Sequence, residues 1–98
     1  MTLPVILRPE AEADVREIYQ YLDEVRIGLG EQFSSRLREV LQQIESMPEI
    51  FGVVWRDVRA VRLRKFQYVV YYVVFTERVE VLAVMHGARH ESSWQSRA

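Results

Sequence analysis

Apolar residues in the first half of the chain repeat with the spacing of an α-helix. After Pro9, four of them recur three or four positions apart: Val15, Ile18, Leu22 and Val25. This spacing places the four on one helix face, and proline is well tolerated in the first turn of a helix. The pattern therefore predicts an amphipathic helix over residues 9–26.

A second helical pattern follows two glycines. Its apolar residues share one face of a helix that begins at about residue 31: Phe33, Leu37, Val40, Leu41, Ile44 and Met47. Pro48 ends this helix because proline cannot continue it. Since only a few residues separate the two helices, we expect them to form an antiparallel hairpin.

The remaining apolar segments have the character of β-strands. A short run at residues 3–8 predicts an N-terminal strand, and residues 48–54 predict a loop. Aromatic and β-branched residues predict three further strands, at residues 55–64, 68–75 and 79–86. These strands follow one another as an antiparallel meander. The predicted fold is α+β, a single domain over residues 1–98 with the helical hairpin packed on one face of the sheet.

The strand YVVYYVVF at residues 68–75 is apolar on both faces. Two helices can cover only one face of the sheet, so the other face is expected to meet a partner. The alternative is that its tyrosines and valines are simply exposed, because about half of any protein surface is apolar.

Charge divides the chain into two halves. The net charge is −1, but residues 1–55 hold five arginines against ten acidic residues, whereas residues 56–98 hold seven arginines and one lysine against four. The basic half suggests an anionic partner. The low overall charge argues against a general nucleic-acid binder, which usually has a strongly basic domain.

The sequence contains no cysteine, which excludes disulfides, thiolate metal sites and a cysteine nucleophile. We find neither a signal-peptide pattern at the N-terminus nor an apolar run long enough to cross a bilayer. We therefore expect a cytoplasmic protein that makes no contact with a membrane.

Cations gather where two predicted strands end. Arg62, Arg64 and Lys65 close the first strand of the meander, and Arg89 and Arg97 follow the last. The ends of these strands can lie side by side, so the cations could converge on one rim and bind phosphates or carboxylates. The alternative is a solvated basic edge that discourages aggregation.

Two histidines lie close to these cations. His86 and His90 would share a face only in a helix, and Gly87 argues against one, so with no third ligand we predict no metal and no other cofactor. His90 could act as a general base beside the arginines. His86 could instead cap backbone groups at the end of its strand.

Trp94 and Arg97 form an aromatic–cation pair three residues apart. Trp94 could anchor a partner, or it could pack the C-terminal segment against the sheet.

Three stretches carry a more specific signal: RPEAEADVREIYQYL, VRLRKFQYVVYYVV and VEVLAVMHGARHESSWQSR. They contain an acidic helix after Arg-Pro, an Arg followed by Phe-x-Tyr and an apolar strand, and a last strand ending in His-x-x-Arg before Trp-x-x-Arg. Together with the order of elements, they resemble the RelE/ParE superfamily of type II toxin–antitoxin toxins over nearly the whole chain.

The resemblance implies a bacterial cytosolic toxin that a cognate antitoxin neutralises by wrapping around it. It implies an α+β fold of the RelE/ParE type, and the free toxin could form a homodimer. We expect the antitoxin on the open face of the sheet, at Tyr68, Val70 and Tyr72.

The superfamily divides by target. ParE-like members inhibit DNA gyrase and are not nucleases, whereas RelE-like members cleave mRNA in the ribosome. A single lysine and a net charge of −1 favour the ParE-like branch, because a ribosome-directed nuclease needs strong positive charge. The residues expected to contact the target are Arg64, Lys65, Arg89, His90, Trp94 and Arg97.

Two alternatives remain open. As an mRNA endoribonuclease, the protein would use His90 to accept the 2′-hydroxyl proton, and Arg62, Arg64 and Arg89 to stabilise the phosphorane. As a non-toxic interaction module, it would bind an antitoxin without inhibiting growth.

Overall fold

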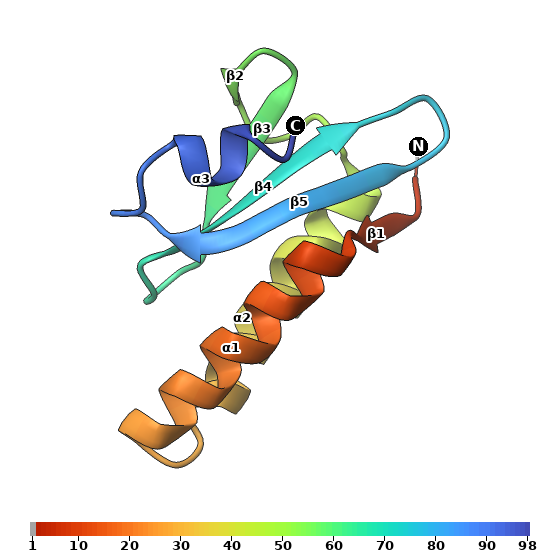
Figure 1. Cartoon of the computed structure of the whole chain (residues 1–98). Coiled ribbons are helices and arrows are strands. Elements are labelled where there is room, and N and C mark those ends of the chain that lie inside the picture. The colour runs from red at the N-terminus through yellow and green to blue at the C-terminus, as the bar shows by residue number, and fades with distance from the viewer. Residues whose placement is uncertain (1) are drawn as a thin grey trace.

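The computed structural model describes residues 2–98 (Figure 1). Its elements in chain order are β1 (Val5–Leu7), α1 (Pro9–Val25), α2 (Leu29–Ser46), β2 (Val53–Trp55), β3 (Val58–Arg62), β4 (Tyr68–Val74), β5 (Val79–His86) and α3 (Ser92–Gln95). None of the helices among these residues is long and apolar enough to cross a membrane.

The two long helices form the predicted hairpin. α1 begins at Pro9 as predicted, and α2 begins at Leu29, two residues earlier than predicted. The carboxylate of Asp23 explains the earlier start: it accepts hydrogen bonds from the backbone N–H groups of Gly28 at 3.1 Å and Gly30 at 3.2 Å. These amides would otherwise lack partners at the start of the helix.

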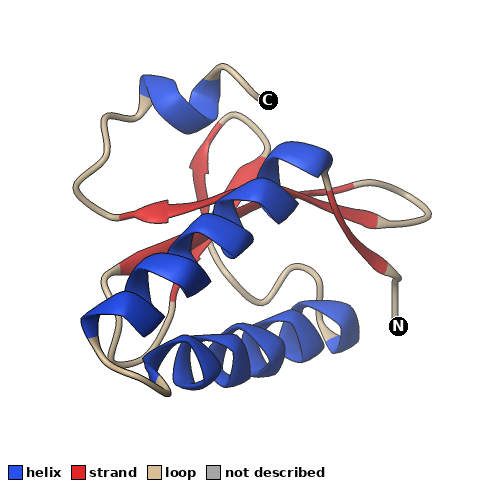
Figure 2. Cartoon of the chain, turned by 60° about the horizontal axis from the view of Figure 1, so that its bottom comes forward, coloured by secondary structure: helices blue, strands red, loops and turns tan. Residues whose placement is uncertain are grey.

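A five-stranded sheet has the order β1-β5-β4-β3-β2. The pairs from β5 to β2 are antiparallel, whereas β1 runs parallel to β5 and pairs with its first three residues, from Val5 opposite Val79 to Leu7 opposite Val81. Figure 2 shows that α1 and α2 lie on one side of the sheet and α3 on the other. The predicted α+β arrangement, with the helical hairpin on one face, is confirmed.

The segment before β3 differs from the prediction. Residues 53 and 54, predicted to lie in a loop, form β2 together with Trp55, and a two-residue turn at Arg56 and Asp57 divides the strand predicted at residues 55–64 and leads into β3. Arg56 adopts a left-handed conformation with φ of +52°. Because glycine or asparagine usually occupies such a position, the sequence carries no turn signal there.

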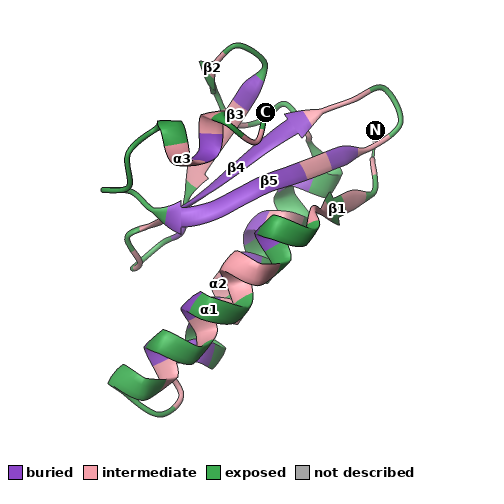
Figure 3. Ribbon diagram, viewed as in Figure 1, coloured by how far each residue is buried: buried purple, intermediate pink, exposed green. Residues whose placement is uncertain are grey.

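The second face of the sheet is covered by the chain itself. The face toward the helices packs buried residues such as Phe33, Ile44 and Tyr72 together. The opposite face forms a separate cluster that includes Tyr71 and Trp94 of α3. Figure 3 shows β4 and β5 buried over most of their length. The expectation that this face waits open for a partner is therefore wrong.

A β-bulge in β5 increases the apolar content of the second face. Tyr71 pairs with Ala83 and Tyr72 with Val81, so Leu82 is an extra residue in β5. Leu82 and Ala83 are both fully buried in the second cluster. The bulge also breaks the regular hydrogen-bond ladder at this point.

Candidate functional site

Two loops meet at the end of the sheet where β3 and β5 finish. Residues 63–67 join β3 to β4, and residues 87–91 join β5 to α3. The backbone N–H of Gly87 donates a hydrogen bond to the carbonyl of Gln67 at 2.7 Å. A methyl group added at Gly87 would lie 3.4 Å from Nη2 of Arg62. The loops therefore lie side by side, as the strand order predicted.

Four cations project from these loops and the adjoining end of β3: Arg62, Arg64, Lys65 and Arg89. We call these four residues the cationic rim. All are exposed, and Nη1 of Arg62 donates a hydrogen bond to the side-chain oxygen of Gln67 at 2.7 Å. None of the four forms an ion pair within residues 2–98, where the paired arginines are Arg8, Arg36, Arg59, Arg78 and Arg97.

The histidines beside the rim bind neighbouring groups of the backbone. Nδ1 of His86 accepts a hydrogen bond from the N–H of Ala88 at 3.0 Å, which confirms the capping alternative. Nδ1 of His90 accepts the N–H of Ser92 at 3.1 Å and lies 2.9 Å from the hydroxyl oxygen of Ser92. His90 thus supports the turn into α3. The described residues contain no group of three histidine or acidic side chains arranged to hold a metal.

Trp94 is a core residue. Its side chain is only 5% exposed, and its ring stacks on Tyr71 with centroids 4.3 Å apart and planes 12° apart. The ring of Trp55 meets Trp94 edge-on at 6.0 Å. The prediction that Trp94 contacts a target is wrong, because burial against the second face leaves its ring inaccessible. The alternative, packing of the C-terminal segment on the sheet, is confirmed.

Arg97 also has a structural partner. Its Nη1 lies 2.6 Å from Oδ2 of Asp14 in α1, and its Nη2 lies 3.3 Å from Oδ1 of the same carboxylate. Nη1 additionally donates to the carbonyl of Leu82 at 3.1 Å. Arg97 is therefore not part of a free contact surface, because its guanidinium is bound between α1 and β5.

The residues predicted to bind the antitoxin point into the core. Val70 and Tyr72 are fully buried among the helices, and Tyr68 is half-buried with its ring 5.5 Å from Phe33. Burial raises the pKa of Tyr72, whose neutral hydroxyl donates to the carbonyl of Pro48 at 3.0 Å. This prediction is wrong because the alternation along β4 turns the three side chains toward α1 and α2.

A groove of about 670 Å³ lies between α2, the following loop and β3. Five apolar side chains line it: Val40, Met47, Ile50, Phe51 and Val61. Its charged lining consists of three arginines and one acid: Arg36, Arg62, Arg64 and Glu39. The groove was not predicted from the sequence, since its apolar residues come from three segments of the chain and show no shared periodicity.

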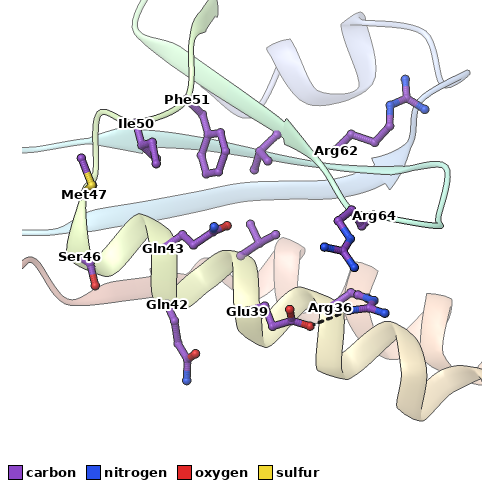
Figure 4. Close-up of a pocket in the computed structure, with 12 residues that line it drawn as sticks. Arg36, Glu39, Gln42, Gln43, Ser46, Met47, Ile50, Phe51, Arg62 and Arg64 are labelled. Carbon is purple, nitrogen blue, oxygen red and sulfur yellow. Dashed lines mark hydrogen bonds and ion pairs between the residues drawn. The ribbon is translucent and has the colours of Figure 1, made fainter.

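The groove is polar at one end and apolar at the other. Figure 4 shows Met47, Ile50 and Phe51 toward one end and Arg36, Arg62 and Arg64 toward the other. Glu39 accepts a hydrogen bond from Arg36 at 3.0 Å, which leaves Arg62 and Arg64 without an acidic partner in the groove. A second hollow of about 390 Å³ shares Met47 and Ile50 and extends the apolar end.

The proposed nuclease residues do not form a connected acid–base set. No hydrogen bond or ion pair within residues 2–98 joins His90 to Arg62, Arg64 or Arg89. Burial raises the pKa of the two tyrosines of β4 nearest this end of the strand, Tyr68 and Tyr71. The rim therefore offers positive charge for binding. Its arginines do not hold His90 or another proton acceptor in place for catalysis.

One comparison with known proteins shows the family of the chain, and another shows its fold. A family model described as "ParE toxin of type II toxin-antitoxin system, parDE" matches residues 5–91. A solved structure described as the chromosomal ParDE TA system from P. aeruginosa matches with a TM-score of 0.65 and 13% sequence identity, covering 87% of this chain and 96% of that one. No curated protein matches the sequence. The residues that the family model matches include the helical hairpin, all five strands and all four cations of the rim.

Proposed function

Because the chain belongs to the ParE toxin family of type II toxin–antitoxin systems, we propose that it is a cytoplasmic toxin that inhibits DNA gyrase by direct contact. Membership of this family implies an antitoxin partner. The observation that carries the proposal is the family match over residues 5–91. The cationic rim supports a role in binding, because its exposed charges have no acidic partner within residues 2–98 and no attached acid–base group. Such a surface suits binding better than hydrolysis.

The chemistry of the rim favours gyrase over mRNA cleavage. A ribonuclease must place a proton acceptor and several cations around one phosphate. Here Nδ1 of His90 is occupied by Ser92, and Arg62 donates to Gln67. The chain also has a single lysine and a net charge of −1, which weakens attraction to the ribosome.

The antitoxin binds along the groove between α2 and β3 in this proposal. Met47 and Ile50 are 59% and 46% exposed, so burying them removes apolar surface from water. Arg62 and Arg64 at the other end suit an acidic side chain. The fitting occupant is an amphipathic antitoxin segment with apolar residues toward Met47 and acidic residues toward Arg64.

The first test compares two activities of the protein freshly released from its antitoxin. One assay measures supercoiling of plasmid DNA by purified gyrase, and the other measures cleavage of ribosome-bound mRNA. The proposal requires blocked supercoiling or stabilised gyrase–DNA cleavage with intact mRNA. Cut mRNA with unaffected gyrase would establish the endoribonuclease reading, and no effect in either assay would favour a non-toxic binding module.

A second test examines the groove. Ile50→Glu and Arg64→Glu should each weaken antitoxin binding at least about tenfold, as measured by calorimetry. Ile27→Glu is the matched apolar control, because Ile27 is 91% exposed at the far end of the helical hairpin. Arg38→Glu is the matched charge control on the outer face of α2. Equal losses in the groove variants and the controls would refute the groove as the antitoxin site.

A further inference from the structure

The four cations of the rim form no ion pair within residues 2–98. Each of the five ion pairs within residues 2–98 uses an arginine outside the rim. Glu91, the acid next to the rim in sequence, accepts a hydrogen bond from Gln95. The charges of Arg62, Arg64, Lys65 and Arg89 are therefore left to solvent or to an external anion.

The rim also lacks the apolar centre of a protein interface. Eight large apolar side chains are exposed in the described chain, and all lie elsewhere: Ile6, Tyr21, Val25, Ile27, Met47, Ile50, Val53 and Val54. Stable protein interfaces bury an apolar or aromatic core inside a polar border. A surface made of cations and small polar groups fits a polyanion better.

The aromatic rings near the rim are not free to stack on bases. Phe66 and Tyr68 both pack edge-on against Phe33, with centroids 6.0 and 5.5 Å away. His86 packs edge-on against Tyr68. Proteins that hold single-stranded nucleic acid usually stack bases on exposed aromatic rings. The rim is therefore suited to the phosphates of a duplex.

We infer that the cationic rim binds the phosphate backbone of duplex DNA, and that it does so while the protein holds gyrase on that DNA. The second half of this inference rests on the proposed function. Gly87 brings the two loops close enough for Arg62 to lie beside the loop that carries Arg89, so cations of both loops are available to one DNA backbone. The acidic first half of the chain keeps free binding weak, which makes the contact depend on DNA already presented by the enzyme.

Direct binding is measured by fluorescence anisotropy with a labelled duplex of about 25 base pairs over a salt series. With four phosphate contacts, the logarithm of the affinity should fall with the logarithm of the salt concentration with a slope of about −3 to −4. The variant Arg64→Gln with Arg89→Gln should lower this slope by about 2 units and weaken binding at least about tenfold at low salt. Arg62 is kept because its guanidinium is hydrogen-bonded to Gln67 in the loop between β3 and β4.

The matched control is Arg16→Gln with Arg38→Gln, which removes two exposed, unpaired charges from the helices. It should keep the wild-type salt slope. Equal losses in both double variants would overturn the inference, because binding would then follow net charge alone. Tighter binding of a single-stranded RNA than of the duplex would also overturn it, in favour of an RNA partner.

Gyrase inhibition separates this inference from the proposed function. The rim double variant should inhibit supercoiling at least about tenfold less than the control at equal concentration. Undiminished inhibition by the rim variant would reject the DNA contact and leave the gyrase proposal standing. Failure of the wild-type protein to inhibit gyrase would reject the proposed function, whereas the anisotropy series would still test the DNA contact.

Discussion

The carboxylate of Asp14 and the guanidinium of Arg97 form a two-pronged ion pair across 83 residues of sequence. Oδ2 of Asp14 also accepts the backbone N–H of Val84 at 3.0 Å, and Arg97 donates to the carbonyl of Leu82. The pair thus forms hydrogen bonds with the backbone of β5 at Leu82 and Val84, beyond the residues of β5 that pair with β1. It joins α1, β5 and the C-terminal segment.

Removal of this pair should destabilise the protein. Asp14→Asn and Arg97→Gln should each lower the free energy of unfolding by about 1–3 kcal/mol, because each leaves a partly buried charge without its partner. Urea unfolding measures the change. Arg36→Gln breaks the exposed Arg36–Glu39 pair and should cost less than about 0.5 kcal/mol. Similar costs for all three variants would mean that the Asp14–Arg97 pair contributes no more than a surface ion pair.

Trp94 should contribute strongly to stability. Trp94→Ala should lower the free energy of unfolding by about 3–5 kcal/mol, since it removes a buried ring stacked on Tyr71. Trp94→Phe keeps an aromatic ring and should cost clearly less. Urea unfolding followed by far-UV circular dichroism measures both variants. A loss below about 1 kcal/mol for the alanine variant would show that α3 is not part of the cooperative core.

Gly30 should resist substitution although it lies in a helix. Glycine to alanine usually stabilises a helix interior by up to about 1 kcal/mol. Here a Cβ would lie 2.9 Å from the carbonyl oxygen of Tyr19, a backbone atom that cannot move without shifting α1. Gly30→Ala should therefore destabilise by about 1–3 kcal/mol.

Gly52 supplies the control for that substitution. A Cβ at Gly52 would meet no atom within 4 Å, so Gly52→Ala should be neutral or slightly stabilising in the same unfolding experiment. A stabilised Gly30→Ala variant would show that the two helices can separate at this point without cost.

Glu80 should make stability depend on pH in the acid range. Hydrogen bonds from Arg8 and then Arg78 lower the pKa of Glu80 below its ordinary value of 4.5. Since the folded-state pKa is lower than that of the unfolded chain, the contribution of Glu80 is fully present above about pH 4.5 and is lost as the pH falls through the folded-state pKa. Glu80→Gln should reduce the loss of stability on acidification.

The test is urea unfolding of the wild type and the Glu80→Gln variant between about pH 6 and pH 3. Glu45, an exposed acid for which the structure gives no ion pair, provides the control through Glu45→Gln. Parallel pH curves for the wild type and the Glu80→Gln variant would contradict the prediction.

The local patterns of the sequence predicted the helices and the three long strands, because periodicity reports burial directly. The partners of individual side chains could not be predicted in this way. The sequence around Trp94 is the same whether the ring contacts a partner or packs on Tyr71. Only the position of α3 on the sheet distinguishes these two possibilities. Arg97 similarly needed Asp14, which lies near the opposite end of the chain.

The cationic rim could be predicted from the sequence, whereas the groove could not. Its members follow two strands that a meander returns to the same end of the sheet, so sequence order was sufficient. The groove depends on how far α2 lies from β3, which no single segment encodes. Val70 and Tyr72 were assigned to the open face because β4 is apolar on both faces, so its sequence does not show which face the helices cover.

The parallel pairing of β1 with β5 has a kinetic consequence. β1 and β5 are separated in sequence by both helices and three other strands, so the chain must close a loop of most of its length before β1 finds its neighbour. Contacts between such distant segments slow folding, whereas the helical hairpin can form locally. Until β1 is in place, β5 exposes an unpaired, apolar edge, so the late entry of β1 sets the period in which the newly made chain is most prone to aggregate.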